Sequence, residues 1–393
     1  MQKFPRNALF MATLLACASA AHAEDAPAPA AAPAPAAAPA APTGPTFSDI
    51  LTNSGVELKG YLDVAAEGTD LATGGNALKV FDTDHTGLGL HQFGLTVDKL
   101  PKEGFGALVN VTAGKDASVI ASYGASANQF DLTQAFIQYA GGPVTLQAGK
   151  FVTLAGAEVI DSSANTNFSR SILFGSIPFT HTGLRLTYAL NDTTNLIAGV
   201  NNGWDQVKDY NTQKTVELGI TANPVKPLTL AASLYSGVEP VVAPATATPG
   251  VTPSGTRTLF DLVATYVATE KLTFIANYDF VSQESTVSLV DGSSKTANYQ
   301  GIALYANYAI DDNSRLSLRG EYLDDKDGFR SGDVGTSHNY KELTATYGYS
   351  FAKNFELRSE LRYDQADKDV FSKQDGSLTK NGTTVAFQGI YKF

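Results

Sequence analysis

The feature that most constrains the fold is an alternation of apolar and polar residues, and it is plainest at the end of the chain. Residues 383–393 place Val385, Phe387, Tyr391 and Phe393 on one face and mostly polar residues on the other, where Ile390 is the exception. A period of two with one apolar face predicts a strand. About ten residues is also the length that a tilted strand needs to cross a bilayer. A soluble sheet can end on such a strand too, so other parts of the chain must decide between the two.

The N-terminus has the order of features found in a secretory signal. Basic residues precede an apolar stretch at 8–18, and a small-residue site follows at 21–23. We therefore predict that residues 1–23 are a signal peptide that is cleaved on export. Lipoprotein processing at Cys17 is the alternative that we keep open. Cys17 is the chain's only cysteine, so cleavage after residue 23 leaves no thiol or disulfide chemistry.

Residues 24–55 have the composition of a periplasmic spacer. From 26 to 46 almost every residue is Ala or Pro, and the recurrent Pro excludes a helix there. Residues 46–55 form either a short helix or a frayed linker. No other stretch approaches the roughly eighteen apolar residues that a spanning helix needs. An exported chain of this kind is either soluble or a β-barrel.

From Val56 onward the alternation recurs in about sixteen segments. The expected strands are 56–66, 87–98, 105–113, 131–140, 143–151, 183–190, 194–203, 214–222, 228–237, 258–268, 271–281, 298–310, 314–323, 340–351, 354–364 and 383–393. In 354–364 the polar face is wholly charged, whereas Ile275 interrupts the polar face of 271–281. A charged face opposite an apolar one suits a membrane barrel, whose interior is polar and whose exterior meets lipid.

The connections between these segments are alternately long and short. The long ones are 67–86, 114–130, 152–182, 204–213, 238–257, 282–297, 324–339 and 365–382. Long loops on one rim and tight turns on the other are typical of outer-membrane barrels. We therefore predict an all-β fold for 56–393, a transmembrane antiparallel β-barrel of about sixteen strands with long extracellular loops and short periplasmic turns.

A ring of this size leaves a water-filled channel, so the expected function is a porin for passive diffusion of small hydrophilic solutes. The third long loop, 152–182, is the longest, and we expect it to fold into the barrel and narrow it. The alternative for this loop is a hydrophobic surface used in subunit contact. The alternative for the whole chain is a structural or adhesive outer-membrane barrel without an open pore.

Charged residues suggest how the narrow point is built. Glu158 and Asp161 of the third loop would face a basic wall about eight strands away, formed by Arg315, Arg319, Arg358 and Arg362. An acidic loop opposite a basic wall produces a transverse field that sorts solutes by charge. The alternative is that the arginines stabilise the wall by pairing with neighbouring carboxylates, Arg319 with Glu321, and Arg358 and Arg362 with Glu356 and Glu360.

Short motifs around the third loop resemble a known family. They are Gly149-Lys150-Phe151, Gly156-Ala157-Glu158, Asn167-Phe168-Ser169-Arg170-Ser171, Pro178-Phe179-Thr180-His181-Thr182-Gly183 and Asn202-Gly203-Trp204-Asp205. Their order resembles the OmpL-like β-barrel porins of Gram-negative outer membranes, most densely over 143–206. The resemblance implies an outer-membrane porin and assigns no solute. The last strand, with Tyr391 and Phe393, resembles the membrane-insertion signal that the barrel-assembly machinery recognises, although Gly389 lies one residue nearer the end than usual.

Other classes of function find little support. The formal charge of -11 becomes about -13 without the signal peptide, which argues against a nucleic-acid partner. The five histidines do not cluster, and no phosphate loop or zinc motif is present, so we expect no catalytic residues, no metal and no cofactor. The expected partners are outer-membrane lipid and lipopolysaccharide, the barrel-assembly machinery and small solutes. Homotrimers are common among sixteen-stranded porins, and a homotrimer stays an option here.

Overall fold

The computed structural model describes residues 44, 46–125, 128–241 and 253–393. The predicted signal peptide and most of the predicted spacer lie outside the described residues and stay predictions. Residues Ser48–Phe393 form one compact unit. Within the described ranges, none of the helices is both long enough and apolar enough to cross a membrane.

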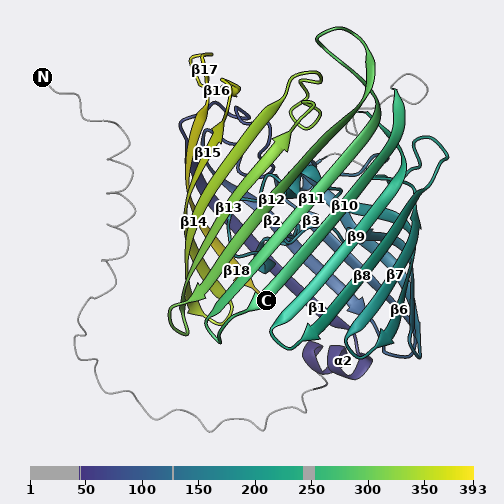
Figure 1. Ribbon diagram of the computed structural model, residues 1–393. Helices are drawn as coiled ribbons and strands as arrows, with labels where there is room; N and C mark the ends of the chain where they lie inside the picture. The colour runs from purple at the N-terminus through teal and green to yellow at the C-terminus, as the bar shows by residue number, and fades with distance from the viewer. Residues whose placement is uncertain (1–43, 45, 126–127, 242–252) are drawn as a thin grey trace, which may run out of the picture. The chain divides into compact units, whose positions relative to one another are not determined.

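Sixteen antiparallel strands close into one barrel, which confirms the predicted fold (Figure 1). They are β1 (Glu57–Thr69), β2 (Thr86–Lys99), β3 (Gly104–Ala113), β4 (Phe130–Gly141), β5 (Val144–Val152), β6 (Thr180–Asn191), β7 (Thr194–Asn201), β8 (Thr215–Val225), β9 (Leu228–Pro240), β10 (Ser254–Val267), β11 (Leu272–Val287), β12 (Ser294–Ala309), β13 (Ser314–Asp325), β14 (His338–Ala352), β15 (Phe355–Ala366) and β18 (Asn381–Lys392). Each pairs with its neighbours in sequence, and β18 pairs with β15 and β1.

The remaining elements are short. They are helix α2 (Phe47–Ser54), helix α3 (Ala117–Ile120), the 3-10 turns η1 (Ser162–Ala164) and η2 (Phe174–Ser176), and the two-residue strands β16 (Phe371–Ser372) and β17 (Leu378–Thr379). Helix α2 occupies the segment for which a short helix or a frayed linker was expected. Strands β16 and β17 pair only with each other, in the last long loop. The alternation of residues predicted neither of them.

The last strand closes the ring. Tyr61 of β1 lies opposite Lys392 of β18, and this antiparallel register runs up to Thr69 opposite Thr384. The ladder continues into the final residue, because Gly60 N donates to Phe393 O at 3.0 Å and Phe393 N donates to Gly60 O at 2.9 Å. The ladder between β1 and β18 thereby reaches the last residue of the chain, as closure of a barrel requires.

Each strand separates an outer apolar face from an inner polar one. In β15, for example, Leu357 and Leu361 are exposed on the outside, whereas Arg358 and Arg362 are buried inside. An apolar exterior around a polar interior is stable only where lipid surrounds the barrel. The inner exception Ile275 packs against a buried apolar cluster, and Ile390 is buried as well.

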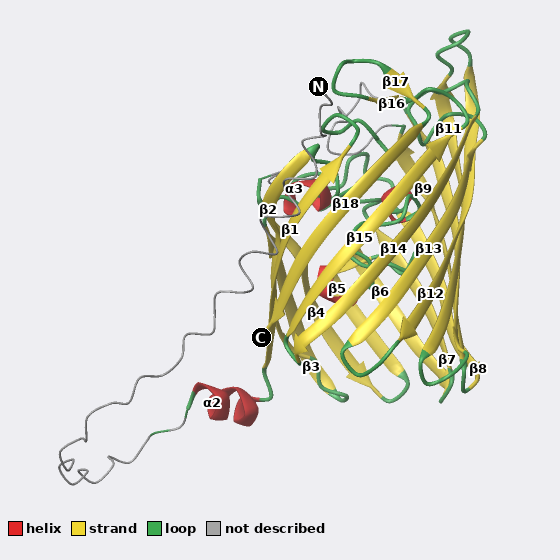
Figure 2. Ribbon diagram, turned by 90° about the vertical axis from the view of Figure 1, so that its left-hand side faces the viewer, coloured by secondary structure: helices red, strands yellow, loops and turns green. Residues whose placement is uncertain are grey.

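Connections at the two rims differ in length (Figures 1 and 2). The short turns contain two to four residues, at 100–103, 142–143, 192–193, 226–227, 268–271, 310–313 and 353–354. The opposite rim carries the longer loops 70–85, 114–129, 153–179, 202–214, 241–253, 288–293, 326–337 and 367–380. We call these the short-turn rim and the long-loop rim. The predicted alternation of connections is therefore confirmed.

Candidate functional site: loop 153–179 and the inner wall

Loop 153–179, between β5 and β6, lies against side chains that point into the barrel. Its first arm follows three consecutive strands, β9, β10 and β11. The backbone N–H groups of Leu154, Gly156 and Ala157 donate in turn to Tyr235 Oη at 2.8 Å, Asp261 Oδ2 at 3.1 Å and Asn277 Oδ1 at 3.0 Å. Wall side chains thus accept hydrogen bonds from backbone N–H groups of the loop that have no partner in a neighbouring strand.

Two wall carboxylates each bind a pair of adjacent backbone N–H groups further along the loop. Glu360 Oε2 accepts from Phe168 N at 2.7 Å, and Glu360 Oε1 accepts from Ser169 N at 2.9 Å. Both bonds are buried, and hydrogen bonds to a charged acceptor are about twice as strong as neutral ones. Glu360 therefore holds the middle of the loop against β15.

Glu321 of β13 binds the loop in the same way at the next pair of anchored residues, Ile172 and Leu173. Its Oε1 accepts from Ile172 N at 3.0 Å and its Oε2 from Leu173 N at 3.2 Å. Ile172 and Leu173 themselves enter an apolar cluster with wall residues such as Leu323. Polar anchoring of the backbone and apolar packing of the side chains therefore fix the same segment.

Arg319 of β13 links the loop to the wall from its donor side. Its guanidinium donates to Glu158 Oε1 at 2.9 Å and to Ser169 O at 2.8 Å, and it also contacts Glu342 at 3.1 Å. Glu321 lies 3.5 Å away on the same strand. Arg319 is fully buried, so these carboxylates supply the countercharge that a buried cation needs.

The other three predicted wall arginines also donate to carbonyl groups of the loop. The bonds are Arg315 to Thr166 O at 2.6 Å, Arg358 to Ser162 O at 3.1 Å and Arg362 to Arg170 O at 2.7 Å. Glu356 accepts from both Arg315 and Arg358, and Asp364 accepts from Arg362. Every one of the four arginines therefore contacts both the loop and a carboxylate.

The predicted pairings are met in part. Glu158 and Arg319 come together, whereas the Asp161 carboxylate caps η1 by accepting from Ser163 N at 2.7 Å. Of the neighbouring pairs proposed for the wall, Arg319 contacts Glu321 at 3.5 Å and Arg358 contacts Glu356 at 3.2 Å. Arg362 binds Asp364 in place of Glu360, because Glu360 is occupied by the backbone of the loop.

Exposure separates Arg315 from the other wall arginines. The side chains of Arg319, Arg358 and Arg362 are at most 1% exposed, whereas that of Arg315 is 23% exposed. The three buried guanidinium groups therefore contact the loop and neighbouring carboxylates, and they are shielded from the water of the lumen.

A second long loop, 70–85, packs on top of loop 153–179. The ring of Phe81 lies 5.9 Å from that of Phe174, and the Arg170 guanidinium lies 5.3 Å from Phe81. Asp82 forms an ion pair with Lys79 at 2.9 Å and lies 3.6 Å from a guanidinium of the wall. Burial alone would raise the pKa of Asp82, but these two cations lower it below its usual value. The carboxylate is therefore held in its charged form.

Loops 326–337 and 202–214 complete the packing at the long-loop rim. Arg330 donates to Ser176 Oγ at 2.7 Å. Asp205 accepts from both Phe179 N and Thr180 N, at 2.8 and 2.9 Å. Burial raises the pKa of Asp205 to about 6. Loop 153–179 is therefore held by the wall below it and by three other loops around it.

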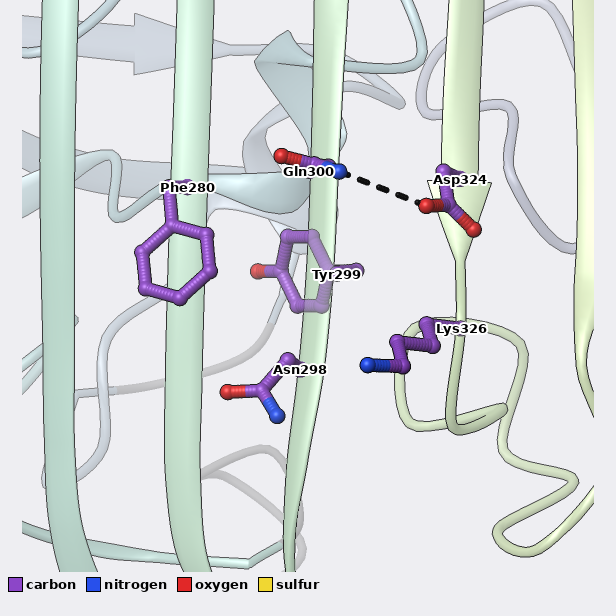
Figure 3. A pocket seen from close by; sticks show the side chains of 6 residues that line it. All are labelled: Phe280, Asn298, Tyr299, Gln300, Asp324 and Lys326. Atoms are coloured by element: carbon purple, nitrogen blue, oxygen red, sulfur yellow. Dashed lines mark hydrogen bonds between the residues drawn. The ribbon is translucent and has the colours of Figure 1, made fainter.

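An open pocket lies on the outer side of the wall, and one of its lining residues, Tyr299, donates inward to Ser176 O of loop 153–179. It is lined by residues near the long-loop ends of β11, β12 and β13, namely Phe280, Asn298, Tyr299, Gln300, Asp324 and Lys326 (Figure 3). Gln300 donates to Asp324 at 3.4 Å across neighbouring strands. The described residues include no group of three or more His, Cys, Asp or Glu side chains arranged to hold a metal.

Several anchoring residues were not predicted for this role. Glu321 and Glu360 were predicted only as partners of arginines, and no role at the site was predicted for Asp261 or Asn277. The signal available in the sequence was the presence of apolar residues on the polar, inner faces of some strands, which indicates that something packs on the wall. Leu259 and Val281, which are fully buried, belong with Ile275 to the wall surface on which the loop packs.

Comparison with known proteins agrees with this architecture. The family described as "Putative beta-barrel porin-2, OmpL-like" matches residues 55–393. OmpT of Vibrio cholerae is 13% identical with a TM-score of 0.58, over 86% of this chain and 97% of that one. DcaP, an outer membrane channel of Acinetobacter baumannii, is 16% identical with a TM-score of 0.58, over 86% and 97%. An anion-selective porin from Comamonas acidovorans is 14% identical with a TM-score of 0.55, over 86% and 99%.

At these identities the likeness to solved structures shows the fold alone. No curated protein sequence matches the chain. The family match, in contrast, covers the whole barrel from β1 to the final residue. The chain belongs to the OmpL-like β-barrel porin family of outer-membrane proteins.

Proposed function

We propose that this protein is a passive diffusion channel of the outer membrane, and that loop 153–179 forms its narrowest part. The observation that carries the proposal is a closed sixteen-strand ring with a polar inner face, to which the loop backbone is bound on several strands. A ring of this size has room for a water-filled lumen. Solutes would pass from the long-loop rim, on the extracellular side, to the short-turn rim in the periplasm. No catalytic step is part of this function.

The wall arginines would act mainly as anchors of the loop. Three of them are buried beside carboxylates, which removes most of the net positive charge that a transverse field needs. Arg315 and Asp161 are the partly exposed members of the predicted set, and we propose that these two groups face the solute. Any charge selectivity at the narrow point should then depend on Arg315 and Asp161.

A specific observation favours a second candidate, a barrel without an open pore. On every strand, a side chain that points inward near the long-loop rim is buried. Examples in ring order are Glu67, Gln92, Thr112, Thr133, Phe151, His181, Asn201, Glu217, Glu239, Arg257, Gln283, Tyr299, Asp325, Tyr340, Asp364 and Thr384. If the loops that cover them never move, the barrel is a closed structural or adhesive element.

Single-channel recording separates the two candidates. Full-length protein, shown to be folded by its heat-dependent gel mobility, is added to planar lipid bilayers. Discrete conductance steps support the channel. Their absence from folded protein, at any voltage tested, would leave the closed barrel as the function.

Further parts of the proposal concern export and assembly. We propose that residues 1–23 are removed as a signal peptide, that 24–55 is a periplasmic spacer, and that Tyr391 and Phe393 are read by the barrel-assembly machinery. The ring of Phe393 lies 6.2 Å from that of Phe93, on the lipid side of the closing seam. One solved form of Vibrio cholerae OmpT is a trimer. A homotrimer surrounded by lipid and lipopolysaccharide is the arrangement we propose here, and chemical cross-linking in outer-membrane vesicles tests it.

A further inference from the structure

The inner wall near the short-turn rim has an unusual composition over strands β2 to β8. Partly exposed hydroxyl and amide side chains on it are joined in cross-strand pairs, and the apolar residues Leu108 and Ile197 lie between them. Thr96 accepts from Asn110 at 2.9 Å, Gln138 accepts from Gln147 at 3.3 Å, and Thr221 accepts from Asn195 at 3.2 Å. We call these six residues the neutral wall.

The exposed part of this wall carries little charge: at the short-turn end of β2, the side chain of Asp98 is 12% exposed and lies 4.0 Å from Lys59 of β1. The charged residues of β3 to β8 are Asp131, Lys150, Arg185 and Glu217, and each is at most 6% exposed. They neutralise one another in pairs, Lys150 with Asp131 at 3.2 Å and Arg185 with Glu217. Asp131, Lys150 and Glu217 lie toward the long-loop ends of their strands, whereas Arg185 lies in the middle of β6, opposite Gln147. A solute near the short-turn rim therefore meets dipoles and only buried, paired charges along β3 to β8.

Such a surface discriminates by chemistry. Amides and hydroxyls each offer both donors and acceptors, and neighbouring strands repeat them about every 4.8 Å. A hydroxylated solute can exchange its hydrogen bonds with water for bonds to this wall. An ion loses part of its hydration shell and gains no countercharge, which costs free energy. Each neutral hydrogen bond is worth only about 1 kcal/mol, so a bound solute also leaves readily.

We propose that the neutral wall binds uncharged polyhydroxylated solutes during passage, and that the channel prefers them to ions of the same size. This inference rests on the channel function proposed above. It assigns the solute class to the short-turn half of the lumen, on the side of β2 to β8. The opposite side, with Arg315 and Glu356, carries the charges.

Three six-carbon probes of matched size test the preference: sorbitol, which is neutral, gluconate, which is anionic, and glucamine, which is cationic. Uptake of each radiolabelled probe is measured in proteoliposomes that contain the full-length protein. Because one hydrogen bond of about 1 kcal/mol corresponds to roughly fivefold, sorbitol should enter at least about fivefold faster than either ion. Equal rates for the three probes would overturn the inference and leave the channel function standing. If none of the three probes enters, both this inference and the proposed channel function are contradicted.

Substitutions then locate the preference. The triple variant Gln147→Met, Asn195→Leu and Thr221→Val keeps side-chain size and removes the polar groups, so the sorbitol advantage should fall to near one. Gln147→Glu keeps hydrogen bonding and adds one negative charge. The ratio of the glucamine uptake rate to the gluconate uptake rate should therefore rise by about fivefold or more. The matched control Thr194→Val changes a β7 residue on the lipid side and should alter neither ratio. Wild-type ratios in the triple variant, or in Gln147→Glu if the triple variant does not fold, would show that the neutral wall is not the selective surface.

Discussion

Replacing Glu360 by Ala should release the middle of loop 153–179 while leaving the barrel closed. The carboxylate of Glu360 accepts two buried backbone N–H groups, from Phe168 and Ser169, and also the hydroxyl of Thr346. Alanine offers no acceptor, so both N–H groups must stay unpaired or bind water after the loop moves. The strands themselves lose no ladder bond, because only a side chain changes.

The size of the effect follows from those two bonds. A hydrogen bond to a charged group contributes about 1.5–3 kcal/mol, so two of them contribute about 3–6 kcal/mol to holding the loop. Water that enters the site offsets part of this loss, and we expect a net change of about 3 kcal/mol. Since about 1.4 kcal/mol corresponds to tenfold, the population of released loop should rise roughly a hundredfold.

Trypsin reports this population directly. Arg170 is the single Lys or Arg residue between 153 and 179, and it is buried. Cleavage after Arg170 in folded protein should therefore be very slow in the wild type and roughly a hundredfold faster in Glu360→Ala, measured by mass spectrometry of the fragments. Asp367→Ala is the matched control, because Asp367 also accepts a backbone N–H, from Asn339, at a site exposed to solvent. Equal cleavage rates in the wild type and Glu360→Ala would refute the anchoring role.

Three further predictions concern stability and assembly. Arg319→Met should lower the temperature at which the folded gel band disappears, because it leaves several buried carboxylates without their shared cation, a loss of about 3–5 kcal/mol; an unchanged temperature would show that the ion pairs contribute little. Asp205→Asn keeps the acceptor oxygen and removes the charge. The pKa of Asp205 is raised to about 6, so its stabilising contribution is present near pH 4 and lost as pH rises through 6. In urea unfolding, the free energy of unfolding of the variant should equal that of the wild type at pH 4 and exceed it at pH 8 by at most about 3 kcal/mol. A difference in unfolding free energy that is the same at both pH values would contradict this. Deleting Phe393 removes the last two hydrogen bonds of the seam with Gly60 and should reduce the yield of folded barrel in outer membranes, whereas a normal yield would argue against a role in assembly.

Sequence alone predicts the barrel well, because contact with lipid on one face of each strand imposes the alternation of apolar and polar residues on which the prediction rests. All sixteen strands lie where alternation placed them, and the errors concentrate at the long-loop ends. Strand β11, for example, runs to Val287 although alternation ended near residue 281. Above the lipid, both faces of a strand meet polar surroundings, so main-chain pairing alone extends the strand and the side chains carry no signal.

The site was less predictable, because most of its bonds join a wall side chain to the loop backbone. The pair of Glu158 and Arg319 joins opposite charges, and charge complementarity predicted it. The binding of Glu360 to two backbone N–H groups has no counterpart in the sequence, since every residue except proline carries that donor. The contact of Asp82 with Arg362 depends on loop 70–85 reaching the wall strand β15 inside the barrel. Apolar residues on the polar faces, such as Ile275, were the one visible sign that something covers the wall.

The most direct test of the channel and its constriction is the single-channel conductance of the wild type beside that of a Glu321→Ala, Glu360→Ala double variant. A channel narrowed by loop 153–179 should give discrete steps in the wild type and larger steps in the variant, because the two wall carboxylates that hold the middle of the loop are gone. Steps of equal size in the two proteins would place the constriction elsewhere. No steps in the wild type, from folded protein, would contradict the channel itself.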